Sequence, residues 1–94
     1  MRVDVRFVAT FRGRVGRKSV VLTLEADTDP TVLDALERTE ERRPALAGDL
    51  LENRRIASTA TVLRNGRFVD RRAAADVPLD HGDELTLSPP LTGG

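Results

Sequence analysis

Hydrophobic and polar residues alternate at the start of the chain, as in a β-strand with one buried face. One side of this alternation carries Val3, Val5, Phe7, Ala9 and Phe11. We therefore predict a first strand that continues through Phe11. Residues 12–17 include two glycines and predict a turn-rich connection. The β-branched run at residues 19–24 predicts a second strand that forms a hairpin with the first.

The spacing of apolar residues becomes helical after the breaker cluster at residues 27–30. Thr31 and Asp34 have the spacing of a capping box at a helix start. Pro44 predicts the helix end, because proline disfavours helical backbone at the residue before it. The apolar stripe of this helix consists of Val32, Leu33, Ala35 and Leu36. The charged residues between 37 and 43 predict a solvated face with intrahelical ion pairs.

The second half of the chain predicts further strands joined by tight turns. Asn65-Gly66 indicates a two-residue hairpin turn, because both residues tolerate the positive φ angles of type I′. The flanking strands are expected at residues 61–63 and from Phe68, and a last strand at residues 84–87. Residues 45–59 are irregular, and we expect their apolar side chains to pack under the sheet: Leu46, Leu50, Leu51 and Ile56. All three phenylalanines are expected in the core: Phe7, Phe11 and Phe68.

The order of these elements is β-β-α-β-β-β, which predicts an α+β fold with one main helix on one face of a mixed sheet. This is the element order of a β-grasp, or ubiquitin-like, roll. The chain has 94 residues, enough for one domain. We expect that domain at residues 1–88 and a flexible tail at residues 89–94.

Composition narrows the possible functions. Fifteen basic residues balance fifteen acidic ones, so net charge predicts no attraction to nucleic acid or membranes. The absence of cysteine excludes disulfides, thiolate metal ligands and a cysteine nucleophile. No apolar run has the length of a signal peptide core or a membrane span, so we expect a cytoplasmic protein. The lone His81 is interpreted as a turn residue, and no metal site is expected. A solvated surface is predicted for Arg64, Arg67, Arg71 and Arg72.

The last six residues are the most informative. Pro89-Pro90 favours an extended path away from the last strand. Gly93-Gly94 has no side chains, so this end can enter a narrow channel that a Cβ atom would block. A carboxylate becomes reactive only after activation, commonly as an acyl-adenylate formed with ATP, which a sulfur nucleophile can then capture. The chain lacks a nucleotide-binding glycine-rich loop and a thiol. We therefore expect a carrier or substrate without catalytic residues of its own, working through the carboxylate of Gly94.

Several stretches resemble the MoaD/ThiS group of ubiquitin-like sulfur carriers and the related small archaeal modifiers. The similarity spans nearly the whole chain, and its most distinctive parts are residues 78–84 and 89–94. The other similar stretches are residues 6–12, 15–16, 30–32, 35–36 and 63–67.

This resemblance implies that a ubiquitin-activating-like adenylyltransferase, using ATP and Mg²⁺, activates Gly94, which then becomes a thiocarboxylate. In the MoaD branch the tail inserts into the large subunit of molybdopterin synthase. We take this small-subunit role as the leading hypothesis. In the modifier branch Gly94 is joined to lysines of target proteins, and one protein can do both. A third possibility is a plain β-grasp interaction domain. The residues expected to insert with Gly94 are Pro89, Pro90, Leu91, Thr92 and Gly93.

The expected partner surface lies beside the tail, at Val8, Leu87 and Ser88. Ser88 stands where the MoaD branch often has an apolar or aromatic residue, which indicates a thinner apolar patch than in that branch. Lys18 is the single lysine and the one side-chain acceptor available if the protein is itself conjugated. A carrier whose tail must stay accessible is expected to be monomeric when free.

Overall fold

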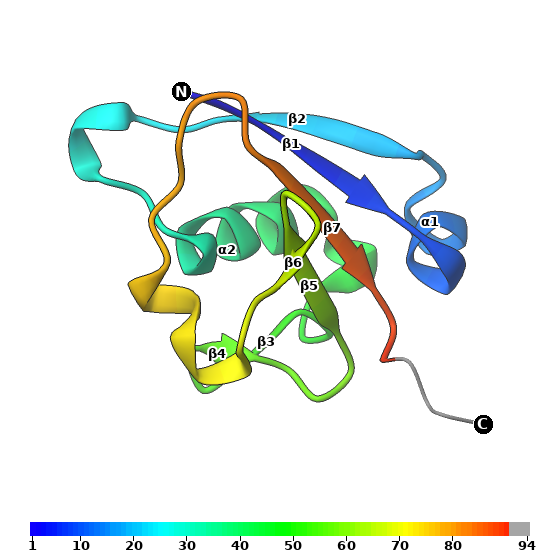
Figure 1. Cartoon of the computed structure of the whole chain (residues 1–94). Coiled ribbons are helices and arrows are strands. Elements are labelled where there is room, and N and C mark those ends of the chain that lie inside the picture. The colour runs from blue at the N-terminus through cyan, green and yellow to red at the C-terminus, as the bar shows by residue number, and fades with distance from the viewer. Residues whose placement is uncertain (91–94) are drawn as a thin grey trace.

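The computed structural model describes residues 1–90, and its centre is a five-stranded sheet (Figure 1). The strands of the chain are β1 (Arg2–Phe7), β2 (Ser19–Thr23), β3 (Leu51–Glu52), β4 (Arg55–Ile56), β5 (Thr61–Arg64), β6 (Arg67–Phe68) and β7 (Glu84–Ser88). Their order across the sheet is β2-β1-β7-β5-β6, and β3 pairs with β4 in a separate ribbon. The β1–β7 pair is parallel, whereas β2, β5 and β6 pair antiparallel with their neighbours. The last strand therefore lies in the middle of the sheet.

The main helix begins where the sequence predicts it. The helical elements are α1 (Ala9–Val15), α2 (Val32–Arg42) and the short 3₁₀ segments η1 (Ala26–Thr28), η2 (Pro44–Leu46) and η3 (Arg71–Asp76). The Thr31 hydroxyl accepts a hydrogen bond from the Asp34 N–H (3.4 Å), and the Asp34 carboxylate accepts one from the Thr31 N–H (2.8 Å). This reciprocal capping box satisfies two free donors of the first turn. The helix ends before Pro44, also as predicted.

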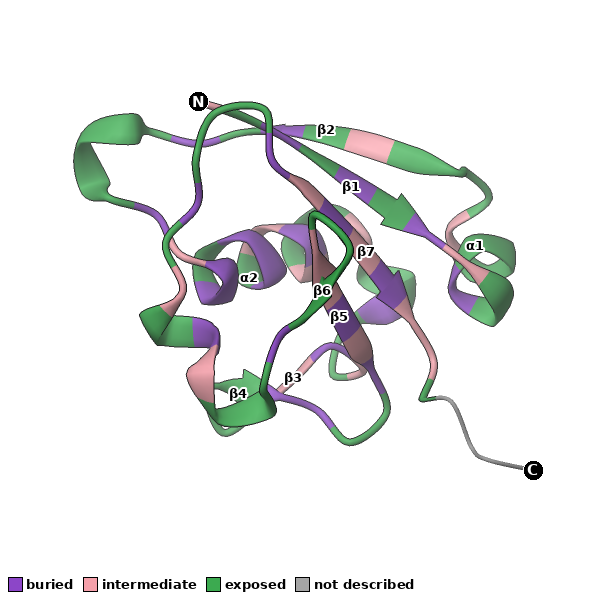
Figure 2. Cartoon of the chain, in the orientation of Figure 1, coloured by how far each residue is buried: buried purple, intermediate pink, exposed green. Residues whose placement is uncertain are grey.

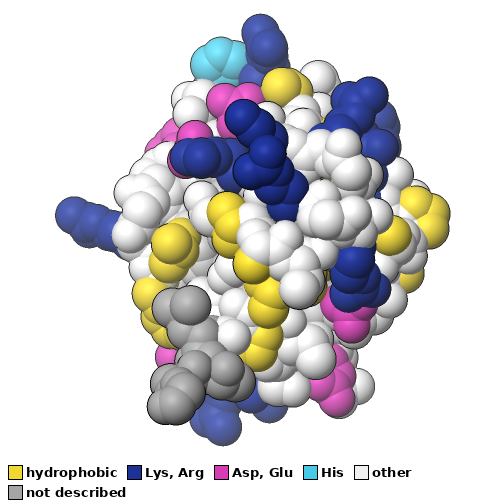
Figure 3. All heavy atoms as spheres, turned by 90° about the vertical axis from the view of Figure 1, so that its right-hand side faces the viewer, with side chains coloured by type: hydrophobic (Ala, Val, Ile, Leu, Met, Phe, Trp, Pro, Cys, Tyr) yellow, Lys and Arg dark blue, Asp and Glu magenta, His cyan; other side chains and the backbone are white. Residues whose placement is uncertain are grey.

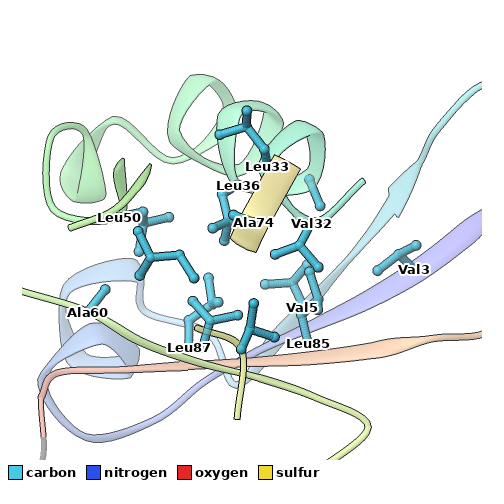
Figure 4. Packing of buried hydrophobic residues seen from close by; sticks show 14 of the residues in the cluster. Val3, Val5, Val32, Leu33, Leu36, Leu50, Ala60, Ala74, Leu85 and Leu87 are labelled. Atoms are coloured by element: carbon cyan, nitrogen blue, oxygen red, sulfur yellow. The ribbon is translucent and has the colours of Figure 1, made fainter. Parts of the chain in front are cut away.

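The core lies between α2 and one face of the sheet (Figures 2 and 4). The alternation predicted for β1 is present, because Val3, Val5 and Phe7 are buried while the residues between them are exposed. Figure 4 shows α2 side chains above those of β1 and β7. The fully buried residues at this contact include Val5, Val32, Leu36, Leu85 and Leu87. One main helix on one face of a mixed sheet is the arrangement that the sequence predicts.

The first strand is shorter than predicted, and the prediction of a strand through Phe11 is wrong. Strand β1 ends at Phe7, and helix α1 replaces both the end of that strand and most of the expected turn. Phe11 is buried and Val15 half-buried, four residues apart on one side of the helix. Gly16 ends α1 with φ +78°, and its N–H bonds the Arg12 carbonyl at 2.9 Å. This left-handed terminus is one that glycine adopts without steric cost.

The irregular segment behaves largely as predicted. Leu46, Leu50 and Ile56 are fully buried and Leu51 is half-buried, so these side chains do pack under the sheet. The small β3–β4 ribbon within this segment was not predicted. The Asn65-Gly66 turn is confirmed by its φ angles of +50° and +83°, the combination that a type I′ turn requires.

The prediction that Phe68 belongs to the core is wrong. Phe7 and Phe11 are buried, but 66% of the Phe68 residue surface is exposed. The two-residue turn fixes the hairpin register and pairs Phe68 with Leu63. Val62 points into the core, so Leu63 and its partner Phe68 face outward. None of the helices within residues 1–90 is long and apolar enough to cross a membrane.

Candidate functional site

The base of the C-terminal tail is fixed on both sides. Strand β7 runs between β1 and β5, and the Val8 N–H bonds the Leu87 carbonyl at 3.1 Å just beyond the β1–β7 ladder. The Ser88 hydroxyl donates to the Pro89 carbonyl at 3.1 Å. Pro89 is half-buried and Pro90 is exposed. The chain thus leaves the sheet from a central strand, anchored at its last residues. The remaining predicted tail residues, Leu91, Thr92, Gly93 and Gly94, lie outside the described part.

The two faces of β7 have different surroundings. Leu85 and Leu87 point inward and have no exposed surface, whereas Glu84, Thr86 and Ser88 are half-buried on the outer face. The assignment of Leu87 to a partner surface is therefore wrong, since its side chain belongs to the core. The period of two along a strand explains the error: Ser88 and Leu87 cannot lie on one face. Val8, the third residue of that prediction, is half-buried.

A different set of residues forms a partly apolar outer surface beside the tail. Across the sheet, Leu63 pairs with both Phe68 and Thr86, and Thr61 pairs with Ser88. Directly paired residues share a face, so these five side chains lie in two adjoining rows. We call them the outer patch: Thr61, Leu63, Phe68, Thr86 and Ser88. Figure 3 shows hydrophobic side chains reaching the surface at this end of the molecule, among Lys and Arg side chains.

The sequence contains a signal for the outer patch in the register of its last hairpin. Once Val62 is placed inside, alternation puts Leu63 outside, and the Asn65-Gly66 turn then places Phe68 opposite Leu63. A position within a strand pattern predicts a core location for Phe68, but it does not by itself decide which face of the strand the side chain occupies. Its exposure is the more informative finding, because an exposed aromatic side chain beside a functional segment is typical of contact surfaces.

A buried carboxylate joins the β5–β6 turn to the segment that leads into β7. Asp83 is 6% exposed and accepts hydrogen bonds from the Asn65 amide and the Arg64 Nε–H, both at 2.9 Å. It also accepts one from the backbone N–H of Asp80 at 2.8 Å. The Asn65 side-chain oxygen in turn accepts from the Glu84 N–H at 2.9 Å. These contacts fix the start of β7 relative to the hairpin that carries Leu63 and Phe68.

The protonation of Asp83 follows from this network. Burial alone would raise the pKa of the Asp83 carboxyl, because it disfavours the charged form. Hydrogen bonds from Asn65, the Asp80 backbone and Arg64, together with the Arg64 charge, outweigh burial and hold the pKa below its ordinary value. Asp83 is therefore ionised at neutral pH and serves as a structural acceptor.

The other candidate side chains have structural surroundings. His81 lies in a turn, where its Nδ1 accepts a hydrogen bond from the Arg2 N–H at 3.0 Å. Arg64 contacts Asp80 and Asp83, so it is not a free member of a basic surface. Arg71 donates through Nε to the Ile56 carbonyl at 2.8 Å. In the part of the chain that the structure covers, no three His, Cys, Asp or Glu side chains are grouped to hold a metal ion. Lys18 is exposed after α1.

Comparison with known proteins identifies the family. A sequence model described as the ThiS family matches residues 5–94. The chain belongs to the ThiS family. It is 39% identical over 94 residues to small archaeal modifier protein 3 of Haloferax volcanii, covering 100% of both chains. The match includes the tail that sequence analysis singled out.

Solved structures of similar proteins share the fold of this chain. The solution structure of a Haloferax volcanii protein has 38% identity and a TM-score of 0.85, covering 100% of this chain and 87% of that one. A chain of the BexX/CysO complex from Amycolatopsis orientalis has 25% identity and a TM-score of 0.77, covering 98% of this chain and 99% of that one. The ubiquitin-like β-grasp fold predicted from the sequence is confirmed. The second neighbour indicates that proteins similar to this ThiS-family chain assemble with other proteins.

Proposed function

We propose that this chain is a ubiquitin-like carrier whose Gly94 carboxylate is adenylated and then converted to a thiocarboxylate. The activating partner, a ubiquitin-activating-like adenylyltransferase, uses ATP and Mg²⁺, and the chain supplies only the carboxylate. The observation that carries this proposal is the family match, which runs from residue 5 through the two glycines to residue 94. The position of Pro89 and Pro90 directly after a central, anchored strand supports it, because the tail then starts from a fixed point.

The proposed partner for sulfur transfer is the large subunit of molybdopterin synthase, in which the sulfur passes to the pterin precursor; another sulfur acceptor is the alternative. We place the protein in the cytoplasm and propose that the free chain is a monomer. We assign partner docking to the outer patch, in place of the surface centred on Leu87. Phe68 supplies an exposed aromatic anchor, and Leu63 and Thr86 extend it toward the base of the tail. A partner that holds these residues would hold the tail in a fixed direction, which favours insertion into a narrow channel.

A second function shares the same activated carboxyl. Conjugation to lysines of target proteins is favoured by the 39% identity, over the full length of both chains, to a protein named as a small archaeal modifier. An amine would then capture the Gly94 acyl group and form an isopeptide bond. Both functions require activation of Gly94, and they differ in the nucleophile that follows.

The test is the intact mass of the protein recovered from cells in which it replaces the native copy. Three forms are compared: the unaltered chain, a chain ending at Thr92, and the same-length variant G93A/G94A. All three end in a carboxylate, but only the last keeps the full tail length while adding Cβ atoms, so it tests the need for a side-chain-free end apart from the need for tail length. We expect modification of the unaltered chain and loss in both variants.

The type of mass change separates the functions. Exchange of one oxygen for sulfur supports the carrier, and larger species containing a second protein support the modifier. If all three forms are unmodified under several growth conditions, the proposal fails and a plain interaction domain is the better description. The last arginine is Arg72, so trypsin leaves residues 73–94 attached to the target lysine. Peptide identification by mass spectrometry must therefore look for this long remnant and not for Gly-Gly.

A further inference from the structure

The chain contains two groups able to accept an acyl group as amines. One is the α-amine of Met1 and the other is the side chain of Lys18, because the remaining fourteen basic residues are arginines. A guanidinium stays protonated in proteins and does not act as an acyl acceptor. Any attachment of this chain to a second copy of itself through an amide bond must therefore use one of these two amines.

The structure distinguishes between them. The Met1 amine donates to the Leu24 carbonyl at 2.6 Å and is partly buried, and the Leu24 N–H returns a bond to the Met1 carbonyl at 2.9 Å. This exchange of bonds continues the β1–β2 ladder by one residue pair. Attack by the Met1 amine on an acyl group would require opening this end of the sheet. The hydrogen bond thus disfavours the α-amine as an acceptor.

Lys18 has the opposite surroundings. It lies between α1 and β2, and its carbonyl accepts the Phe7 N–H at 2.8 Å, so the backbone that carries the amine is held in place. The residue is exposed, and within residues 1–90 its ammonium forms no ion pair. Its amine is thus held on a fixed base and open to solvent.

Lys18 lines a shallow hollow at the α1 end of the molecule. Its lining consists of Ala9, Arg12, Gly13, Gly16, Arg17 and Lys18. A Cβ atom added to Gly13 or Gly16 would meet nothing within 4 Å, so the approach is open on the glycine side. Arg12 and Arg17 form no ion pair with any described residue. Their charges would attract the anionic end of an incoming chain, whether a carboxylate or the phosphate of an acyl-adenylate.

We propose that Lys18 is the site at which a second copy of this chain attaches its Gly94 carboxyl group. The inference rests on the modifier form of the proposed function. The deprotonated Lys18 amine attacks the Gly94 carbonyl carbon of an acyl-adenylate that the activating partner makes from ATP. A C–N bond forms, the bond from that carbon to the phosphate oxygen breaks, AMP leaves with the electron pair, and the amine nitrogen loses a proton to solvent. Repetition would give linear chains of copies.

The experiment uses cells in which the native copy is replaced by one of four forms. These are the unaltered chain, Lys18→Arg, the double variant K18R/R54K, and the chain ending at Thr92. Lys18→Arg keeps the charge and removes the acceptor. R54K restores a lysine at an exposed position outside the hollow, where the one ion pair of Arg54 with residues 1–90 is a 3.9 Å contact with Glu37. Proteins are recovered under denaturing conditions and analysed by intact mass and tryptic peptides.

We expect a species of two copies less one water in the unaltered chain alone. Its tryptic digest should contain residues 18–38 joined to residues 73–94, because trypsin cannot cut after an acylated lysine. Persistence of the species in Lys18→Arg would overturn the proposal, as would its full recovery in K18R/R54K. Detection of a thiocarboxylate, or of conjugates with other proteins, in the absence of the two-copy species would reject Lys18 as an attachment site. The proposed function would remain supported. Absence of every Gly94-dependent species would reject both the attachment at Lys18 and the proposed function.

Discussion

Strands β5 and β7 are neighbours in the sheet, and their two faces differ sharply. On the inner face Val62, Leu85 and Leu87 have no exposed surface and belong to the hydrophobic core. Figure 4 shows Leu85 and Leu87 facing α2. On the outer face the paired residues Leu63 and Thr86 are half-buried, and Phe68 next to them is largely exposed. Residues adjacent in sequence, such as Val62 and Leu63, therefore alternate between the buried core and the outer surface of the sheet.

This contrast separates stability from recognition within a few residues. Buried side chains contribute through the apolar area they remove from water, and their loss leaves a cavity. Phe68, the exposed member of the outer patch, loses little buried area when truncated, because 66% of its surface already contacts solvent. Substitutions on the inner face of a strand should consequently lower stability. Substitutions on the outer face should weaken partner binding.

The largest effect is expected for Leu87→Ala on the inner face. We expect the free energy of unfolding to fall by about 2–5 kcal/mol, because a fully buried leucine leaves a cavity at the centre of the core. Ser88→Ala, one residue along on the outer face, should change it by less than about 0.5 kcal/mol. Urea denaturation followed by circular dichroism measures both. Equal losses would mean that the two faces do not differ as described.

Much of the fold could be predicted because its signals are local. The β1 alternation, the Thr31–Asp34 capping box, Pro44 and the Asn65-Gly66 turn each act over a few residues, and all four appear in the structure. The fold class followed from the order of elements. The tail chemistry could be inferred because two glycines and two prolines are informative without tertiary contacts.

The wrong predictions have two causes. Either strand and helix spacing fit the same residues, or strand register decides which face a side chain occupies. Ala9 and Phe11 continue the spacing of a strand, while Phe11 and Val15 have the spacing of a helix, and tertiary packing favours the helix. Leu87 and Phe68 were misplaced because hydrophobicity was considered without the face that pairing imposes. The Asp83 network joins residues up to 19 positions apart, which no local pattern reports.

The next largest effect concerns the polar network that fixes the outer patch to β7. Asp83→Asn should lower the free energy of unfolding by about 1–3 kcal/mol, because the side chains of Arg64 and Asn65 lose a buried, charged acceptor. Asp80→Asn is the matched control. Its side chain is 83% exposed and contacts the same arginine at 3.2 Å, so a loss below about 1 kcal/mol is expected. Thermal unfolding of both variants at neutral pH tests the difference, and equal losses would argue against a special role for the buried carboxylate.

A smaller effect should appear in the pH dependence of stability. The folded pKa of Asp83 is lower than its unfolded value, so folding favours the ionised form. The resulting stability is complete well above the ordinary aspartate pKa of about 3.9 and is lost as the pH falls through the folded value. In the unaltered chain we expect unfolding free energy to fall more steeply below about pH 4 than in Asp83→Asn. Parallel curves for the two proteins would contradict the assignment.

The smallest effect on stability, and the sharpest test of the contrast between faces, is expected for Phe68→Ser. Phe68 and Val21 are the two large hydrophobic residues with substantial exposure among residues 1–90, at 66% and 48%, and they lie on opposite edge strands of the sheet. Truncation of either should change the unfolding free energy by no more than about 0.5 kcal/mol, since little buried area is lost.

Only Phe68 adjoins Leu63 and the strand that leads into the tail. Phe68→Ser should therefore lower the Gly94-modified fraction measured by intact mass, while Val21→Ser leaves it unchanged. If both variants lower it equally, docking uses exposed hydrophobic surface in general. If neither does, the outer patch is not the docking site, and the activating partner recognises the tail without it.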